Sequence, residues 1–383
     1  MKTTIKVGSD FSGVGAFNQA LMRLGIDYQE VFACDMDKFA RQTFIHNYGE
    51  PEYYPMNVYD REIPKDSLDI YMTSPPCQAF SMAGKRLGKE DARGILFFNS
   101  LEFIQVNNPR FFIFENVRGL LSHDKENKKD KIGRTFKEWI DYLGGKSVNG
   151  VTNMMPIDGA VPYHLHYKVL NAKKHGVPQN RERVFLIGIR DDQDNTFTWP
   201  AEEELTKRLK DVLEDSVDDK YFLSEKMLNF VLTTNFQEAK PIDINRDAAP
   251  CVKVGGDVSC FDTNKLKIKS GTIKGYDEDT ACNHGFMVGD YRTDEGFRWR
   301  KDRNSPCIHS NLKDIDFNEK RGQQAILYNN YYKIRRLTPR ECFRLMDFPD
   351  TFTWPVSDSQ AYKQAGNSIV VRVLEKIINN LPL

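Results

Sequence analysis

The sequence predicts an α/β protein: a Rossmann-like, mostly parallel sheet joined to a second, smaller, irregular β-rich domain. Three observations support this. Short apolar runs alternate with helical patterns up to residue 198, as expected for a sheet covered by helices on both faces. From Trp199 onward this pattern gives way to short pieces punctuated by glycine. The last segment, SIVVRVLEKIINNL, returns to an amphipathic helix.

Apolar runs predict the elements of the first part in order. Strands are expected over residues 4–10, 30–35, 68–76, 110–117 and 183–190, and helices over 16–25, 37–48 and 95–108. A further helical piece over 338–348 closes the irregular region. We therefore expect a first domain over 1–198, a second over 199–355, and a C-terminal helix over 356–383 that rejoins the first.

Composition excludes several classes of protein. Lys+Arg and Asp+Glu both number 54 in a chain of 383 residues, so a generic polyanion binder is disfavoured, although a local basic cleft is still allowed. The seven cysteines form no CxxC pair, which gives no support for a metal site and suggests a reducing compartment. The N-terminus is unlike a signal peptide and no run of 18 apolar residues occurs. These features predict a cytoplasmic protein without a membrane partner.

A glycine-rich turn, DFSGVGAF, joins the first strand to the first helix. Gly13 and Gly15 allow a tight turn and close approach of a ligand, and the helix start offers free N–H groups. The second strand ends in Asp35, where dinucleotide-binding folds place an acid that bonds a ribose. The pattern is not GxGxxG, so a nucleoside-like ligand such as S-adenosylmethionine fits. The alternative is a tight turn that binds nothing.

Cys77 follows two prolines at the end of the third strand, in the run TSPPCQAFS. The carboxyl edge of an open α/β sheet faces the ligand crevice, and prolines stiffen the approach to the thiol. A cysteine there is a candidate nucleophile once its thiolate is favoured. The alternative is a buried structural thiol.

Glu115 ends the fourth strand in FENV, and Arg181 and Arg183 precede the fifth in QNRERVF. Burial would raise the pKa of Glu115 and let it donate a proton near neutral pH, although a capping or solvated acid is an equal alternative. Alternate residues of a strand share a face, so the two arginines should point the same way and suit a carboxylate or phosphate. The alternative is a surface ion pair with Glu182.

Together these segments resemble the DNA cytosine-5 methyltransferase family of prokaryotic or phage type. The resemblance spans the chain in the family's order. It is carried by DFSGVGA, CDMDKFA, TSPPCQAFSMAGKR, FENVRGL, QNRERVFLIG, RRLTPRECFRLMDFP and QAGNSIVVRVL. It implies a methyltransferase fold that binds S-adenosylmethionine, and methyl transfer to carbon-5 of a cytosine flipped out of a specific duplex DNA sequence.

The resemblance also assigns roles to residues. Cys77 would attack carbon-6, Glu115 would bond nitrogen-3 and the amine, and Arg181 would support the base carbonyl, with Arg183 beside it. The implied cofactor residues are Phe11, Ser12, Gly13, Val14, Gly15, Asp35, Met36, Asn57, Pro76, Asn367 and Ser368. Asn57 stands where the family usually has Asp, and Met36 replaces a more typical aromatic or bulky aliphatic residue.

The second domain would be the target-recognition domain. Implied DNA contacts near the nucleophile are Gln78, Ser81 and Arg93, in a segment that resembles the family's mobile loop. Within the second domain we expect contacts from Arg298, Arg300 and Arg303, although an ordinary solvated hairpin is an equal alternative. Cys307 in SPCI is placed at the family's Thr-Leu position, with APCV at 249–252 as a weaker candidate.

Three other functions are alternatives. A tRNA methyltransferase of the same family would have a short second domain and a Cys-Phe-Thr motif, which does not occur here. A silent DNA-binding relative would not need Cys77, Glu115 and Arg181 intact. A small-molecule thiol enzyme would not need a long recognition domain. We expect a monomer that acts on duplex DNA, and any cognate restriction endonuclease would act as a separate protein.

Overall fold

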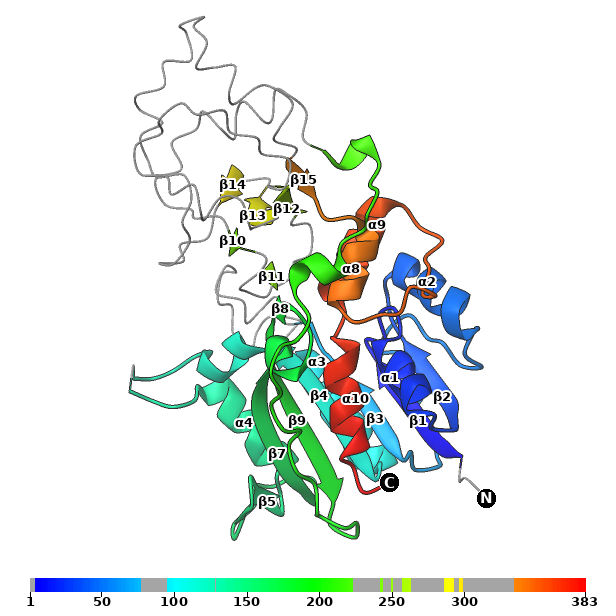
Figure 1. The fold of residues 1–383 in the computed structure, drawn as a ribbon. Coiled ribbons are helices and arrows are strands. Elements are labelled where there is room, and N and C mark those ends of the chain that lie inside the picture. The colour runs from blue at the N-terminus through cyan, green and yellow to red at the C-terminus, as the bar shows by residue number, and fades with distance from the viewer. Residues whose placement is uncertain are drawn as a thin grey trace, which may run out of the picture.

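The computed structural model describes residues 4–76, 95–127, 129–222, 242–243, 249–250, 257–262, 286–292, 296–298 and 334–383. Its main element is an eight-stranded sheet with the order β2-β1-β3-β4-β9-β7-β5-β6 (Figure 1). These strands are β1 Ile5–Asp10, β2 Tyr28–Cys34, β3 Ile70–Thr73, β4 Phe111–Val117, β5 Ser147–Val148, β6 Val151–Thr152, β7 Tyr163–Asn171 and β9 Glu182–Arg190. The α/β class predicted from the sequence is confirmed.

Seven α-helices and four 3₁₀-helices accompany the strands within the described residues. The α-helices are α1 Ala16–Leu24, α2 Lys38–Tyr48, α3 Ile95–Asn107, α4 Arg134–Leu143, α8 Pro339–Leu345, α9 Asp358–Asn367 and α10 Val371–Asn379. The 3₁₀-helices are η2 Arg118–Ser122, η3 Ala172–His175, η4 Leu209–Val212 and η5 Asp219–Tyr221. The sequence did not predict strand β7 or helix α4, nor the short strands β5 and β6 and the 3₁₀-helices.

The sheet is parallel over β2, β1, β3 and β4 and mixed beyond them. Strands β2, β1, β3 and β4 run parallel, whereas β9 is antiparallel to both β4 and β7. The chain adds β2 on one side of β1, and then adds β3 and β4 on the other side. The order of the strands therefore switches between β1 and β3. Ligands of open α/β sheets bind at such a switch point, outside the carboxyl ends of the strands. The turns that follow β1 and β3 therefore lie where a ligand is expected.

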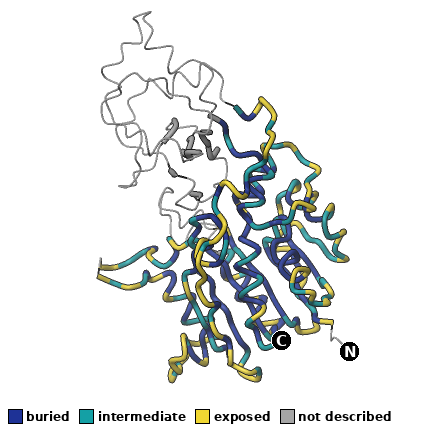
Figure 2. The backbone as a smooth tube through the Cα atoms, viewed as in Figure 1, coloured by how far each residue is buried: buried dark blue, intermediate teal, exposed yellow. Residues whose placement is uncertain are grey.

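Both faces of the sheet are covered, because residues along each central strand alternate between two cores. Phe111 and Ile113 of β4 belong to the core made with α1 and α10. Phe112 and Phe114 belong to the core made with α3 and α4. Figure 2 shows the resulting concentration of buried residues on the central strands. Fixed on both faces, the sheet gives the turns at its carboxyl edge a rigid base.

The C-terminal segment packs against the first two helices of the chain. Leu374, Ile377 and Ile378 of α10 are buried in the core that contains α1. Arg23 of α1 pairs with Glu375 of α10 at 2.9 Å. Gln364 of α9 accepts a buried hydrogen bond from Thr43 of α2 at 3.0 Å. Helices α9 and α10 thus pack against α1 and α2, and the sequence predicted that the last helix would rejoin the first domain.

A second, antiparallel sheet contains β10 Ile242–Asp243, β12 Asp257–Asp262, β13 Phe286–Arg292, β14 Gly296–Arg298 and β15 Ile334–Arg336. Separately, β8 Gln179–Asn180 and β11 Ala249–Pro250 form a parallel pair. The segments that lead to and from the second sheet pack on the first domain: Leu209, Val212, Phe343 and Phe352 are buried in the core shared with α1 and α10.

A polar cluster is buried between α1 and β2, behind the turn that follows β1. The Asn18 amide donates to Oε2 of Glu30 at 3.0 Å. Oε1 of Glu30 is buried and has no hydrogen-bond partner among the described residues. Burial raises the pKa of Glu30 to about 7, and the Asn18 hydrogen bond opposes this rise only in part. The folded protein therefore holds this proton more tightly than the unfolded chain does.

Because the pKa of Glu30 is raised on folding, stability should fall as the pH rises from about 4.5 to about 7. The shift corresponds to at most about 3 kcal/mol. We expect Glu30→Gln to raise the free energy of unfolding at about pH 8 and to change it little at about pH 5. Urea unfolding at both pH values tests this, with the exposed Glu50→Gln as the matched control. Equal effects of Glu30→Gln at the two pH values would contradict the prediction.

Candidate active site

The turn after β1 contains three residues in the left-handed region of the backbone map. Phe11 has φ 57°, and Gly13 and Gly15 have φ 56° and 82°. A side chain at Gly15 would strike the ring of Tyr48, because its Cβ would lie 2.2 Å from that ring. At Gly13 the nearest heavy atom would be the Phe11 carbonyl oxygen at 4.0 Å. Gly15 is thus required for packing, whereas Gly13 leaves space for a ligand.

Asp35 lies directly beyond the end of β2 and faces this turn. One carboxylate oxygen accepts the backbone N–H of Gly13 and the other accepts that of Asp37, both at 2.8 Å. Burial raises the pKa of Asp35, and these two hydrogen bonds oppose the rise. Each carboxylate oxygen keeps further acceptor capacity. The carboxylate can therefore still take the hydroxyls of a ribose.

The other predicted cofactor residues lie around this turn. Met36 is 79% exposed beside Asp35, which suits a residue that covers a flat ligand. Asn57 is exposed, and its Oδ1 accepts the Tyr59 N–H at 3.1 Å in a local turn. Ser12 Oγ hydrogen-bonds the Tyr54 hydroxyl at 3.2 Å, while Val14 is buried. Asn367 is exposed at the end of α9, and the next residue, Ser368, is buried.

Glu115 lies at the same edge of the sheet, close to the end of β4. Since β9 is antiparallel to β4, its first residues lie beside this end, with Arg183 opposite Val117. Nε of Arg183 lies 3.0 Å from Oε1 of Glu115, and both side chains are largely buried. Burial raises the pKa of Glu115, while the charges of Arg183 and then Arg181 oppose the rise. The direction agrees with the expectation for a proton-donating carboxyl.

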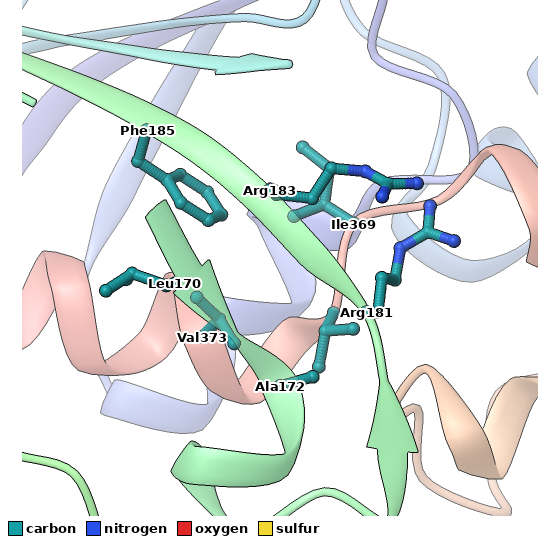
Figure 3. A pocket seen from close by; sticks show the side chains of 8 residues that line it. Leu170, Ala172, Arg181, Arg183, Phe185, Ile369 and Val373 are labelled. Atoms are coloured by element: carbon teal, nitrogen blue, oxygen red, sulfur yellow. The ribbon is translucent and has the colours of Figure 1, made fainter. Parts of the chain in front are cut away.

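The two arginines share a side of the chain but differ in their partners (Figure 3). Arg181 lies between β8 and β9, and its Nη2 donates to the carbonyls of Gly366 and Ser368 at 3.0 and 2.7 Å. The role of supporting the base carbonyl was predicted for Arg181, whereas the structure gives Arg183 the ion pair with Glu115. A cavity of about 10 Å³ lies beside both arginines and is far too small for a cofactor.

Asn116 has a role that the sequence analysis did not assign. Its buried amide donates to the carbonyl of Pro75 at 3.1 Å and so ties the turn after β3 to the end of β4. Pro75 is buried and Pro76 is exposed. The sequence signal for this role is that Asn116 directly follows Glu115. This contact fixes the backbone two residues before Cys77.

Several predicted residues lie outside the described part of the chain. They are Cys77, Gln78, Ser81, Arg93, Arg300, Arg303 and Cys307. Arg298 ends β14, whose backbone pairs with β13. The segment APCV, the weaker candidate for the family's Thr-Leu position, begins with β11. Strand β11 pairs with β8, whose residues directly precede Arg181. The described residues contain no helix long and apolar enough to cross a membrane.

Known proteins match both the sequence and the fold. A family model described as C-5 cytosine-specific DNA methylase matches residues 5–382. The orphan methyltransferase M.SPRI of Bacillus phage SPR is 31% identical, over 98% of this chain and 97% of its own length. The type II methyltransferase M.HpaII of Haemophilus parainfluenzae is 30% identical, over 96% of this chain and 89% of its own.

The solved structures that resemble this chain show the fold alone. The Entamoeba histolytica methyltransferase EhMeth gives a TM-score of 0.61 at 17% identity, covering 99% of this chain and 98% of its own. The S. pombe Dnmt2 methyltransferase gives 0.58 at 20% identity, covering 98% and 97%.

Fold and site together define an enzyme of the S-adenosylmethionine-dependent methyltransferase class. Within that class, the chain belongs to the C-5 cytosine-specific DNA methylase family. It is a DNA cytosine-5 methyltransferase, with S-adenosylmethionine as the methyl donor.

Replacing Asp35 by alanine should weaken S-adenosylmethionine binding. The variant loses a hydrogen bond to a charged group, worth about 1.5–3 kcal/mol, and also releases the Gly13 amide. Calorimetry on the folded variant measures the effect, with Asp27→Ala on the exposed turn before β2 as the control. An unchanged dissociation constant for Asp35→Ala would overturn its assignment to the ribose.

Proposed function

We propose that the chain methylates one cytosine within a specific duplex sequence, through a covalent adduct with Cys77. The observation that supports this most is the largely buried Glu115–Arg183 pair. It lies at the sheet edge, and the Asn116–Pro75 hydrogen bond holds the backbone before Cys77 against the same strand end. The backbone that leads to the proposed nucleophile and the proposed proton donor thus come from the neighbouring strands β3 and β4. The target cytosine must leave the base stack to reach them.

The chemistry assigned to the chain begins with the thiolate of Cys77, which forms a bond to carbon-6 of the cytosine. Glu115 donates a proton or hydrogen bond at nitrogen-3, so the ring accepts the electron pair and carbon-5 becomes nucleophilic. Arg183 holds the Glu115 carboxyl in place and is our first candidate for contact with the base carbonyl. Once carbon-5 has taken the methyl group, its proton is lost to a base, and that electron pair restores the ring double bond as the thiolate leaves and nitrogen-3 gives its proton back to Glu115.

S-adenosylmethionine supplies the electrophilic methyl group when it is bound. We assign its ribose to Asp35, its adenine to Met36 and Asn57, and its remaining contacts to the turn Phe11–Gly15, Pro76, Asn367 and Ser368. The open space at Gly13 and the remaining acceptor capacity of Asp35 support this assignment.

Sequence recognition is assigned to residues 199–355, with residues 1–198 and 356–383 as the catalytic unit. Because both flanks of this segment pack in the first core, the part that reads DNA would lie between Phe222 and Ile334. Base pairs beside the target stay stacked and must be read from the major groove. Within this part of the chain, the proposed DNA contacts are Arg298, Arg300 and Arg303, and Cys307 is proposed to contact the backbone of the target nucleotide. Near the nucleophile, the proposed DNA contacts are Gln78, Ser81 and Arg93.

Single replacement of Arg298, Arg300 or Arg303 by alanine should change sequence choice. Loss of a base-reading arginine should cost about 1–3 kcal/mol and relax the site at one position. Loss of a phosphate contact would weaken all sequences alike. Mapping methylated sites across a genome separates these outcomes, with Arg118→Ala as an exposed arginine control. If all three variants keep the wild-type motif and rate, the reading elements lie elsewhere.

We further propose that the enzyme acts as a monomer in the cytoplasm, apart from any endonuclease. Relatives named both as orphan and as type II methyltransferases match this chain at similar identity, so a cognate endonuclease would be a separate protein. Size-exclusion chromatography with and without duplex DNA tests the monomer, and a stable dimer would contradict it.

Labelled S-adenosylmethionine with duplex DNA, and separately with tRNA, tests the substrate. We expect label in the duplex and none in tRNA, and Cys77→Ser should label neither. Label in tRNA alone would establish tRNA as the substrate. No label in either nucleic acid would favour a DNA-binding protein without catalytic activity. Bisulfite sequencing of DNA from cells expressing the chain then identifies the methylated cytosine and its neighbours.

A further inference from the structure

An ion pair with no access to water lies beneath the proposed cofactor site. Nε of Arg61 donates to Oδ1 of Asp10 at 2.9 Å, and the exposed fractions of the two side chains are 2% and 0%. The Tyr71 hydroxyl donates to the other oxygen of Asp10 at 2.5 Å. The Arg61 guanidinium lies 4.6 Å from the Phe103 ring centroid, and Phe103 stacks on Tyr71. Asp10 thus has a partner at each oxygen.

The three residues come from three elements that meet at the switch point of the sheet. Asp10 is the last residue of β1 and directly precedes the turn Phe11–Gly15. Tyr71 lies on β3, which pairs with β1. Arg61 belongs to the segment between α2 and β3, four residues after Asn57.

That segment crosses the ends of the first strands and is fixed at several points. The Tyr53 carbonyl accepts the N–H of Ala33 at 3.2 Å, and the Pro55 carbonyl accepts that of Asp35 at 3.3 Å. The Arg41 side chain also donates to the Pro55 carbonyl, at 3.1 Å. Arg61 joins the same segment to Asp10, at the end of β1. The exposed residues Met56 and Asn57 lie between these attachments.

Packing alone does not explain this arrangement. Desolvating two charges opposes their attraction, and well-packed apolar residues often replace a buried ion pair without loss of stability. The surroundings of Arg61 include the aromatic rings of Phe32 and Phe103, which would accept an apolar side chain. An ion pair has a definite geometry that an apolar contact lacks, and it joins the two segments to which the proposed function assigns the cofactor.

We propose that Asp10, Arg61 and Tyr71 are positioning residues for the methyl donor. They set the distance between the turn Phe11–Gly15 and the segment that carries Met56 and Asn57, and so hold both sides of the adenosine site ready before the donor binds. This inference rests on the proposed cofactor residues. A site prepared in this way avoids the cost of ordering the two segments when the ligand binds.

The test is a double variant, Asp10→Leu with Arg61→Met, which removes both charges and leaves neither one buried alone. Its dissociation constant for S-adenosylmethionine should rise about tenfold, because binding must then order the two segments. KM for the donor should rise in parallel, while kcat at saturating donor should stay within about twofold of wild type. Tyr71→Phe keeps the stacked ring, and it should raise KM for the donor by a smaller factor if the double variant does not fold.

The control is another buried arginine–carboxylate pair among the described residues, Arg335–Glu341, whose side chains are 8% and 0% exposed and 2.7 Å apart. Arg335→Met with Glu341→Leu should lower the melting temperature and leave donor affinity unchanged. The inference is overturned if the Asp10/Arg61 variant binds the donor as tightly as wild type, or if the control loses affinity equally. If Asp35→Ala also leaves donor binding unchanged, the cofactor assignment itself fails.

Discussion

Cys77→Ser is expected to abolish methyl transfer while the fold and donor binding persist. A serine hydroxyl is far harder to ionise than a thiol, so the bond to carbon-6 of cytosine cannot form at a useful rate. Loss of the nucleophile from an enzyme of this kind should lower turnover by about four orders of magnitude or more. Single-turnover methylation of a duplex that carries the target site measures the loss.

A duplex with 5-fluorocytosine at the target should trap the wild-type protein, because fluorine cannot leave as a proton does. The trapped complex should survive denaturing electrophoresis, whereas Cys77→Ser should form none. The matched control is Cys342→Ser, since Cys342 is buried in α8 within the described core. Retained turnover in the Cys77 variant, or trapping without it, would remove this residue from its role.

Glu115→Gln should lower the single-turnover rate by about 10²–10⁴-fold, the usual contribution of a general acid. Glutamine keeps the shape of the side chain but has no carboxyl proton to give. Donor affinity should stay near that of wild type, since the assigned cofactor contacts lie on other turns. A variant as active as wild type would make Glu115 a structural residue that only pairs with Arg183.

The pH dependence of the same step follows from the raised pKa of Glu115. A carboxyl whose pKa is raised keeps its proton to higher pH than an exposed one does, and it loses the proton as the pH rises through the raised value. The rate limited by Glu115 should therefore fall on the alkaline side. This fall should be absent from the residual rate of Glu115→Gln. The same alkaline fall in both enzymes would assign it to another group.

Sequence patterns predicted the cofactor half of the sheet well, because apolar strands and a glycine turn are local features. They missed α4, although Phe136, Trp139, Ile140 and Leu143 have helical spacing and are buried. They also missed β7, whose inward positions alternate with histidines and a lysine and so give no apolar run.

The partners of individual side chains were less predictable than the elements. Placing Arg181 and Arg183 on one side required only strand periodicity, whereas their partners depend on the antiparallel start of β9 and on the turn after α9. The Asp10–Arg61 pair joins residues 51 positions apart, and although Asp10 begins the motif DFSGVGA, Arg61 lies in none of the quoted motifs. The raised pKa of Glu30 likewise arises from burial between two elements, which no local pattern reports.

The packing of α9 and α10 on the first two helices also determines when this enzyme can become active during synthesis. Ribosomes add about 5–20 residues per second, and the N-terminal half of the core emerges first. Helix α1 then lacks the buried side chains of α10, and α2 lacks its contact with Gln364. The whole segment between β9 and α9 must be made before the core can close. A nascent chain that stops before Val371 should therefore remain inactive.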